Sequence, residues 1–179
     1  MISLKIYSKS DGLDSVDLLQ AAQDHFRAAE YLFEKSPSFF DSAGYLMHMA
    51  AEQILKAKLL HENGRYKGTH QLRELYSSLQ GVEVELSERL SATLDLLDSY
   101  DYLRYPNRNQ PIEVGSEDLP EIRKLLLHMV DLLPIELKVA ASQIDPLVKG
   151  GRFLAKKKII QEGETEVEDA SDGAVDGAT

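Results

Sequence analysis

Apolar residues recur at helical spacing in the first part of the chain. From position 15 to position 34 they step by three and four residues, as the buried face of a helix does. The members of this face are Val16, Leu19, Ala22, Phe26, Ala29 and Phe33. Ser36 and Pro37 follow, and proline disfavours helical backbone in the residue before it, so we predict a first helix over 15–34.

The next helix, predicted over Phe39–Asn63 and ended by Gly64, carries two apolar faces. One face consists of Phe39, Ala43, Leu46, Ala50, Ile54 and Ala57, and the other of Phe40, Met47, Ala51, Leu55 and Leu59. A surface helix needs only one such face, so two faces indicate burial on two sides. We expect one side to pack on the chain's own bundle and the other on a second copy, which predicts a homodimer through Phe39–Asn63.

Caps and apolar spacing predict three further helices, over 69–79, from 85 or 87 to about 103, and over 116–133. Thr69 and Ser116 are the expected caps of the first and last of these. Residues 105–115 contain two prolines, two asparagines and a glycine, which is the composition of a loop. Residues 135–145 are predicted to be helical again.

The two ends of the chain have their own patterns. Alternating Ile2, Leu4 and Ile6 predict a short strand, with residues 152–160 as its expected partner. The last 19 residues carry seven acids and no base, which is typical of disorder. We divide the chain into an N-terminal segment (1–13), a helical bundle (14–146), a basic segment (147–160) and an acidic tail (161–179). The expected fold class is all-α, an antiparallel bundle of about five helices with a small terminal strand pair.

Composition narrows the classes of function. The net charge is −10, but setting the tail aside leaves 23 acids against 20 bases, so the body is close to neutral and lacks the broad basic face of a general nucleic-acid binder. Without cysteine there is no disulfide framework and no cysteine-type zinc site. Apolar runs are too short to span a bilayer and the N-terminus lacks a signal-peptide pattern, so we expect a cytoplasmic protein without membrane contact.

Three short motifs occur in order on the predicted helices. They are residues 51–57 (AEQILKA), residues 69–72 (THQL) and residues 103–106 (LRYP). Together they resemble the HEPN family (higher eukaryotes and prokaryotes nucleotide-binding domain), and the resemblance covers residues 14–134. It implies a helical bundle that associates with nucleotide or RNA and works as a dimer. Such chains often accompany a minimal nucleotidyltransferase in a toxin–antitoxin or defence pair.

One departure from the family bears on activity. In its ribonuclease branches, an Arg that stabilises the phosphate is followed after four to six residues by a His that helps the RNA 2′-hydroxyl attack. Arg104 matches the Arg, but Asn109, Gln110 and Pro111 occupy the places where the His would fall. Asn cannot take a proton near neutral pH, so the general base is missing. The resemblance therefore leaves Arg104 as the one candidate catalytic residue and implies degraded or no ribonuclease activity.

The candidate ligand-binding residues fall in two groups. Arg104, Tyr105 and Asn109 are expected at a phosphate or base site, although Arg104 also suits a helix C-terminus without any ligand. His48, Glu52 and Lys56 form one polar line at i, i+4 and i+8. That line is either a binding line in a dimer cleft or, as the spacing favours, a solvated stripe of paired side chains. Metal ligation needs further ligands that the sequence does not offer, so we expect no metal and no cofactor.

The sequence leaves three hypotheses about function, which belong to different classes. The leading hypothesis is a homodimeric HEPN-like module that binds nucleotide or RNA near Arg104 with little or no ribonuclease activity. The alternative is a non-catalytic dimerisation or partner-binding bundle paired with a minimal nucleotidyltransferase in a toxin–antitoxin or defence system. A third is an active ribonuclease in which Arg104 works with His48 or His70 of the facing subunit.

Overall fold

The structure is a computed structural model that describes residues 5–79, 86–105, 109 and 111–142. The chain divides into one unit of residues Met1–Ala141, which contains the bundle, and a second of Ser142–Thr179. The predicted basic segment and acidic tail, and the residues predicted to be helical after Ser142, lie outside the described residues.

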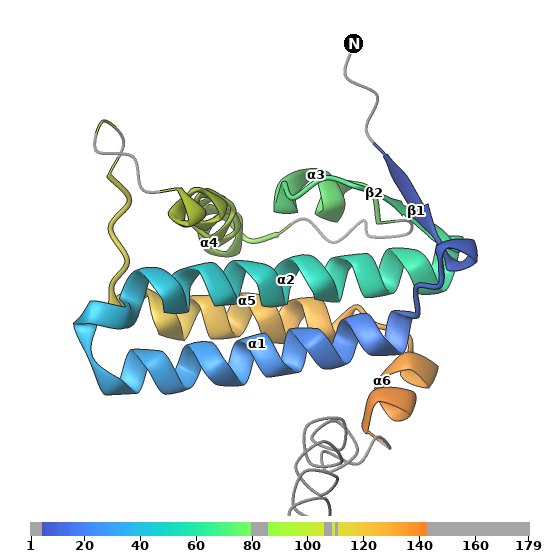
Figure 1. Ribbon diagram of the computed structural model, residues 1–179, viewed down its shortest axis with the longest axis horizontal. Helices are drawn as coiled ribbons and strands as arrows, with labels where there is room; N and C mark the ends of the chain where they lie inside the picture. The colour runs from blue at the N-terminus through green and yellow to red at the C-terminus, as the bar shows by residue number, and fades with distance from the viewer. Residues whose placement is uncertain (1–4, 80–85, 106–108, 110, 143–179) are drawn as a thin grey trace, which may run out of the picture. The chain divides into compact units, whose positions relative to one another are not determined.

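Helices α1 (Ser15–Lys35) and α2 (Phe40–Asn63) form an antiparallel hairpin, close to the predicted bounds (Figure 1). The Asp14 side chain caps α1 by accepting a hydrogen bond of 2.6 Å from the Val16 N–H. A short 3₁₀ turn, η2 (Pro37–Phe39), connects the two helices. Gly64 ends α2 with a positive φ of 68°, a left-handed conformation that glycine adopts without strain.

The remaining helices pack around this hairpin. They are α3 (Leu72–Ser77), α4 (Glu88–Ser99), α5 (Leu119–Asp131) and α6 (Ile135–Ser142). A 3₁₀ turn, η3 (Tyr100–Arg104), follows α4, and another, η4 (Ser116–Asp118), precedes α5. Figure 1 shows α3 and α4 on the side of α2 opposite α1. The all-α bundle is therefore confirmed. Helix α3 begins later than predicted because the Asp98 carboxylate, rather than Thr69, accepts from the Leu72 N–H at 2.6 Å.

A small antiparallel sheet pairs β1 (Ile6–Ser8) with β2 (Arg65–Lys67), with Tyr7 opposite Tyr66. The prediction of a small strand pair is confirmed, but the partner of the N-terminal strand is the segment after α2. The turn at Gly64 brings this segment back toward the N-terminus, and its Tyr66 ring stacks on Tyr7 with ring centroids 5.6 Å apart. Residues 152–160, the partner predicted from the sequence, lie outside the described residues.

Helix α2 is the centre of the bundle. It contacts α1, α3, α4, α5, η3 and β2. Residues of both predicted apolar faces, among them Ala43, Ile54, Met47 and Leu55, are buried by the chain itself. The two-faced pattern therefore has an explanation within one chain, and it no longer supports a dimer through Phe39–Asn63. Dimerisation stays a hypothesis.

Two features fix the region where α4 ends. The Tyr100 side chain is fully buried, and its hydroxyl donates to Asp118 Oδ2 at 3.2 Å, which ties η3 to the start of α5. Burial, with the negative charge of Asp118, raises the pKa of the Tyr100 phenol. Gly44 on α2 allows close approach, because a Cβ there would lie 3.1 Å from the Tyr100 ring and 3.2 Å from Leu103. Among the described residues, no helix combines the length and hydrophobicity needed to cross a membrane.

Candidate functional site

The polar line on α2 is buried. The exposed fractions of His48, Glu52 and Lys56 are 0, 4 and 7%. The favoured prediction of a solvated stripe is therefore wrong. The line faces groups from outside the helix, since the Lys56 ammonium lies 5.3 Å from the Tyr66 ring centroid and His48 reaches the end of α4. Buried ionisable groups are costly unless they are paired, so their partners explain how they are tolerated.

Glu52 is the central carboxylate of this line. Its Oε1 accepts from Lys56 Nζ, and its Oε2 lies 3.0 Å from His70 Nδ1 and 3.5 Å from His48 Nε2. Burial would raise the pKa of Glu52, but hydrogen bonds from His48, Lys56 and His70 and the charge of Lys56 together lower it to about 2. Glu52 is therefore ionised at neutral pH, and it holds three bases from two segments of the chain.

His48 links Glu52 to the 3₁₀ turn η3. Its Nδ1 lies 2.9 Å from the Leu97 carbonyl oxygen, and because a carbonyl only accepts, Nδ1 is the donor. Its Nε2 faces two carboxylates, Glu52 at 3.5 Å and Asp101 Oδ1 at 3.7 Å. His48 is too deeply buried to touch a ligand, so any role it has is exercised through Asp101.

Arg104 closes the line at the surface. Its Nη2 forms an ion pair of 2.7 Å with Asp101 Oδ1, and its guanidinium carbon lies 5.7 Å from the ring centroids of both Tyr45 and Tyr105. Partial burial tends to lower the pKa of Arg104, but the charge and hydrogen bond of Asp101, with the two tyrosines, together raise it. The guanidinium is thus a permanent cation that is held beside two aromatic rings by a carboxylate.

The structure brings five of the six predicted ligand-binding residues into one connected set. Tyr105 and Arg104 lie at its surface end, and Lys56, Glu52 and His48 form its buried end. The sixth, Asn109, is exposed, and its neighbours at 106–108 and 110 lie outside the described residues. Of the tyrosines near Arg104, Tyr100 is fully buried in the core, whereas Tyr102 and Tyr105 are 67 and 76% exposed.

Sequence reasoning missed two members of the site. Asp101 precedes Arg104 by three residues, a spacing at which opposite charges meet on a helical turn, so a signal for it existed. Tyr45 has no such local signal, because it reaches Arg104 only through the packing of α2 against η3.

A hollow of about 300 Å³ lies beside this set, and its walls come from α4, η3 and the segment before α3. It is lined by His70, Gln71, Asp95, Asp98, Ser99, Asp101 and Tyr102. Its three carboxylates are already engaged, by Arg73, by the Leu72 N–H and by Arg104 respectively. Within the described part of the chain, no three His, Cys, Asp or Glu side chains are grouped so that they could hold a metal ion.

Comparison with known proteins agrees with this fold. The family model of the HEPN domain matches residues 15–138. The crystal structure of TT1696 from Thermus thermophilus is similar, with a TM-score of 0.52 and 23% sequence identity over 65% of this chain and 96% of that chain. At this identity the likeness concerns the fold alone. No curated protein matches significantly. The match over most of the bundle shows that the chain belongs to the HEPN domain family.

Proposed function

We propose that the chain binds nucleotide or RNA at the surface formed by Arg104, Tyr45 and Tyr105. The observation that carries this proposal is a permanent cation within 5.7 Å of two tyrosine ring centroids, one of them that of Tyr105, which is 76% exposed. A guanidinium suits a phosphate, and an exposed tyrosine ring suits a base. The ion pair with Asp101 keeps Arg104 in place, and as a partly exposed pair it can be exchanged for a phosphate at modest cost.

We further propose that ribonuclease activity is weak or absent. The loop after Arg104 carries no His, and the His48 side chain is fully buried. His70 is half-exposed and lines the same hollow as Asp101, but its Nδ1 is held by Glu52 at 3.0 Å. Neither the loop after Arg104, nor the buried His48, nor the engaged Nδ1 of His70 therefore supplies a free base for a ribose held by Arg104.

Binding is tested by fluorescence anisotropy with labelled single-stranded RNA and with a fluorescent ATP analogue at low salt. Arg104→Ala is expected to weaken binding at least tenfold, because it removes a hydrogen bond to a charged group. Tyr105→Ala is expected to weaken it roughly fivefold to a hundredfold through lost stacking. Arg123→Ala is the matched control, because Arg123 is also an exposed arginine in an ion pair, with Glu30 at 2.7 Å. Absence of saturable wild-type binding would refute the proposal.

Incubation of the pure protein with total RNA tests the second part. Little or no cleavage is expected for the wild type. Rapid cleavage that is lost in His70→Ala would overturn it, because His70 would then supply the base that the loop lacks.

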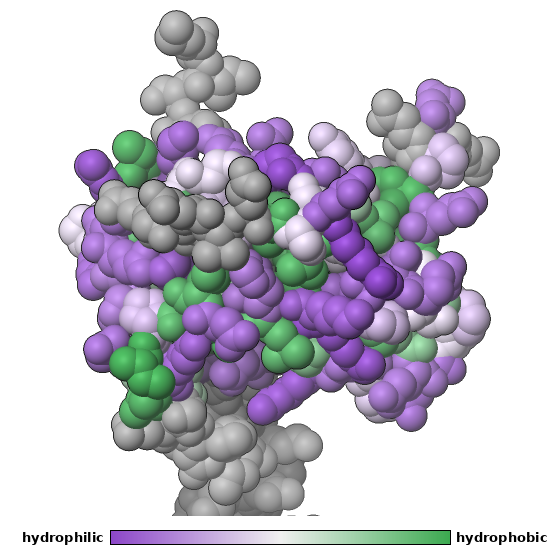
Figure 2. All heavy atoms as spheres, turned by 180° about the vertical axis from the view of Figure 1, so that it is seen from behind, coloured by the Kyte–Doolittle hydropathy of each residue, from purple (hydrophilic) through white to green (hydrophobic). Residues whose placement is uncertain are grey.

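A second candidate is a non-catalytic dimerisation or partner-binding bundle, whose partner would be a second copy or a minimal nucleotidyltransferase. In its favour, α5 and α6 expose Leu127 and Ile135, each at 64%. Against a large permanent interface, polar side chains predominate on the described part of the face in Figure 2, and the apolar ones form separate small patches. Sedimentation equilibrium at micromolar concentration decides, since a dimer mass that Leu127→Asp reduces to the monomer favours this candidate.

A further inference from the structure

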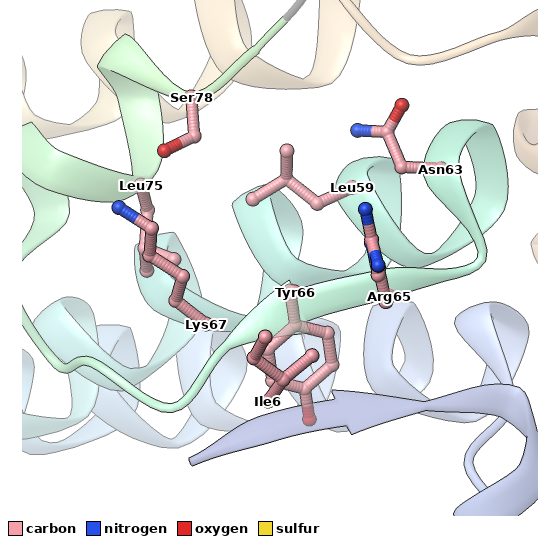
Figure 3. A pocket seen from close by; sticks show the side chains of 8 residues that line it. All are labelled: Ile6, Leu59, Asn63, Arg65, Tyr66, Lys67, Leu75 and Ser78. Carbon is pink, nitrogen blue, oxygen red and sulfur yellow. The ribbon is translucent and has the colours of Figure 1, made fainter. Parts of the chain in front are cut away.

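A second hollow lies at the opposite end of α2 from the Arg104 surface. The αL turn at Gly64 reverses the chain after Asn63, so that β2 runs back beside the end of the helix, with α3 beyond it. The space enclosed between these three elements has a volume of about 450 Å³, within the range of small-molecule sites. It is shown in Figure 3 and is lined by Ile6, Leu59, Asn63, Arg65, Tyr66, Lys67, Leu75 and Ser78.

The lining separates into an apolar base and a polar rim. Leu59 and Leu75 are buried, at 3 and 1% exposed, and Ile6 adds an apolar side chain that is 57% exposed. The rim in Figure 3 carries the guanidinium of Arg65 near the amide of Asn63, and the amine of Lys67 on the side of Ser78. None of the four rim side chains is a carboxylate. Asn63, Arg65 and Lys67 can donate hydrogen bonds to a ligand, whereas the Ser78 hydroxyl already donates to the Glu74 carbonyl oxygen at 2.8 Å.

The charge of the rim is positive. Arg65 and Lys67 are two residues apart on β2, so their side chains project from the same face of the strand, whereas the buried Tyr66 projects from the other. Lys67 forms an ion pair of 3.0 Å with Glu74, but its side chain is 55% exposed, so solvent screens this pair. Arg65 forms no ion pair with any described carboxylate.

We propose that this hollow binds a small organic anion, a phosphate or carboxylate attached to a flat apolar body. The anionic group pairs with Arg65 and, after exchange with Glu74, with Lys67, while Asn63 donates a further hydrogen bond. The apolar body packs against Leu59 and Leu75 at the base of the hollow.

This site is separate from the Arg104 surface. Tyr45 and Leu59 are both on α2, about 21 Å apart at a rise of about 1.5 Å per residue. The inference therefore does not depend on the proposed nucleotide or RNA binding at Arg104, and substitutions at the two places distinguish them.

The test uses the full chain and 1-naphthyl phosphate, whose binding is followed by its fluorescence and by chemical-shift changes of backbone amides. Saturable binding is expected, with shifts concentrated at the end of α2, in β2 and in α3. Arg65→Gln is expected to raise the Kd roughly tenfold to a hundredfold. Lys67→Gln is expected to raise it less, because Lys67 must first leave Glu74. Arg123→Gln, a change of equal charge on α5, is expected to leave the Kd unchanged.

Three companion probes separate the parts of the ligand. Neutral 1-naphthol and inorganic phosphate are both expected to bind at least tenfold more weakly than 1-naphthyl phosphate. 1-Naphthoate carries a carboxylate in place of the phosphate. Whichever of 1-naphthyl phosphate and 1-naphthoate binds more tightly identifies the head group that the site prefers. The proposal is overturned if 1-naphthol binds as tightly as the anions, or if Arg65→Gln, folded by its amide spectrum, keeps the wild-type Kd. It is equally overturned if Arg104→Ala, rather than Arg65→Gln, abolishes binding.

Discussion

Helices α1 and α2 are neighbours of similar length, but they differ in where their ionisable side chains lie. The buried residues of α1 are small, apolar or uncharged polar, and its charged side chains face outward. Helix α2 buries His48, Glu52, Lys56 and Lys58 at the centre of the bundle. Because burying charge lowers stability unless every group is paired, α2 depends on its ion pairs for stability in a way that α1 does not. The buried line ends at Asp101, which holds the one arginine that the family resemblance singles out.

The largest expected effect is on Glu52. Glu52→Ala leaves Lys56 without its carboxylate and removes the partner of His48 and His70, so we expect the free energy of unfolding to fall by about 3–5 kcal/mol. Glu34→Ala removes an exposed carboxylate from α1 and is expected to change it by less than about 0.5 kcal/mol. Urea denaturation measures both. If the two substitutions lowered the free energy of unfolding equally, the buried carboxylate of α2 would be no more important for stability than an exposed one of α1.

The pH dependence of stability tests the charge of Glu52 with a variant, Glu52→Gln, that keeps the size of the side chain and so leaves no cavity. The pKa of Glu52 is about 2 in the folded protein, against an ordinary value of 4.5. Because the folded value is depressed, the stabilisation is complete above the unfolded pKa and is lost as the pH falls from about 5 toward 2. The difference in unfolding free energy between wild type and Glu52→Gln should shrink by roughly 3 kcal/mol over this window. Parallel curves for the two proteins would contradict the account.

Close packing of α2 against η3 gives an intermediate effect. A Cβ at Gly44 would lie 3.1 Å from both Tyr100 and Val114, so Gly44→Val overpacks this contact and should cost about 1–3 kcal/mol. Ala28→Val on the exposed side of α1 should cost about 0.5 kcal/mol, from helix propensity alone. Thermal unfolding measures both variants, and a stabilising Gly44→Val would show that η3 moves easily away from α2.

The smallest effect is expected at an ion pair of α1. Glu30 accepts from Arg123 Nε of α5 at 2.7 Å, but the two side chains are 28 and 43% exposed. A pair of this kind contributes about 0–1 kcal/mol, so Glu30→Ala should lower stability by no more than that in urea denaturation. A loss as large as that of Glu52→Ala would mean that exposure does not separate the two kinds of pair.

Much of the fold follows from local pattern. The spacing of apolar residues and the turn residue Gly64 predict α1 and α2 almost to the residue, because these signals lie within each helix. The start of α3 is mispredicted because its cap, Asp98, comes from another helix. The site shows the same limit, since Arg104 and Glu52 are recognisable in the sequence, whereas the burial of Glu52 depends on what covers α2. The partner of β1 likewise depends on where the turn after α2 directs the chain.

The salt dependence of RNA binding tests the central claim, that Arg104 contacts a phosphate, most directly. The logarithm of the binding constant for a labelled single-stranded RNA is measured against the logarithm of salt concentration, for the wild type, Arg104→Ala and Arg123→Ala. Loss of one phosphate contact should make the slope shallower by about 0.7 in Arg104→Ala alone, together with weaker binding at low salt. An Arg104→Ala variant with the affinity and slope of the wild type would contradict the account.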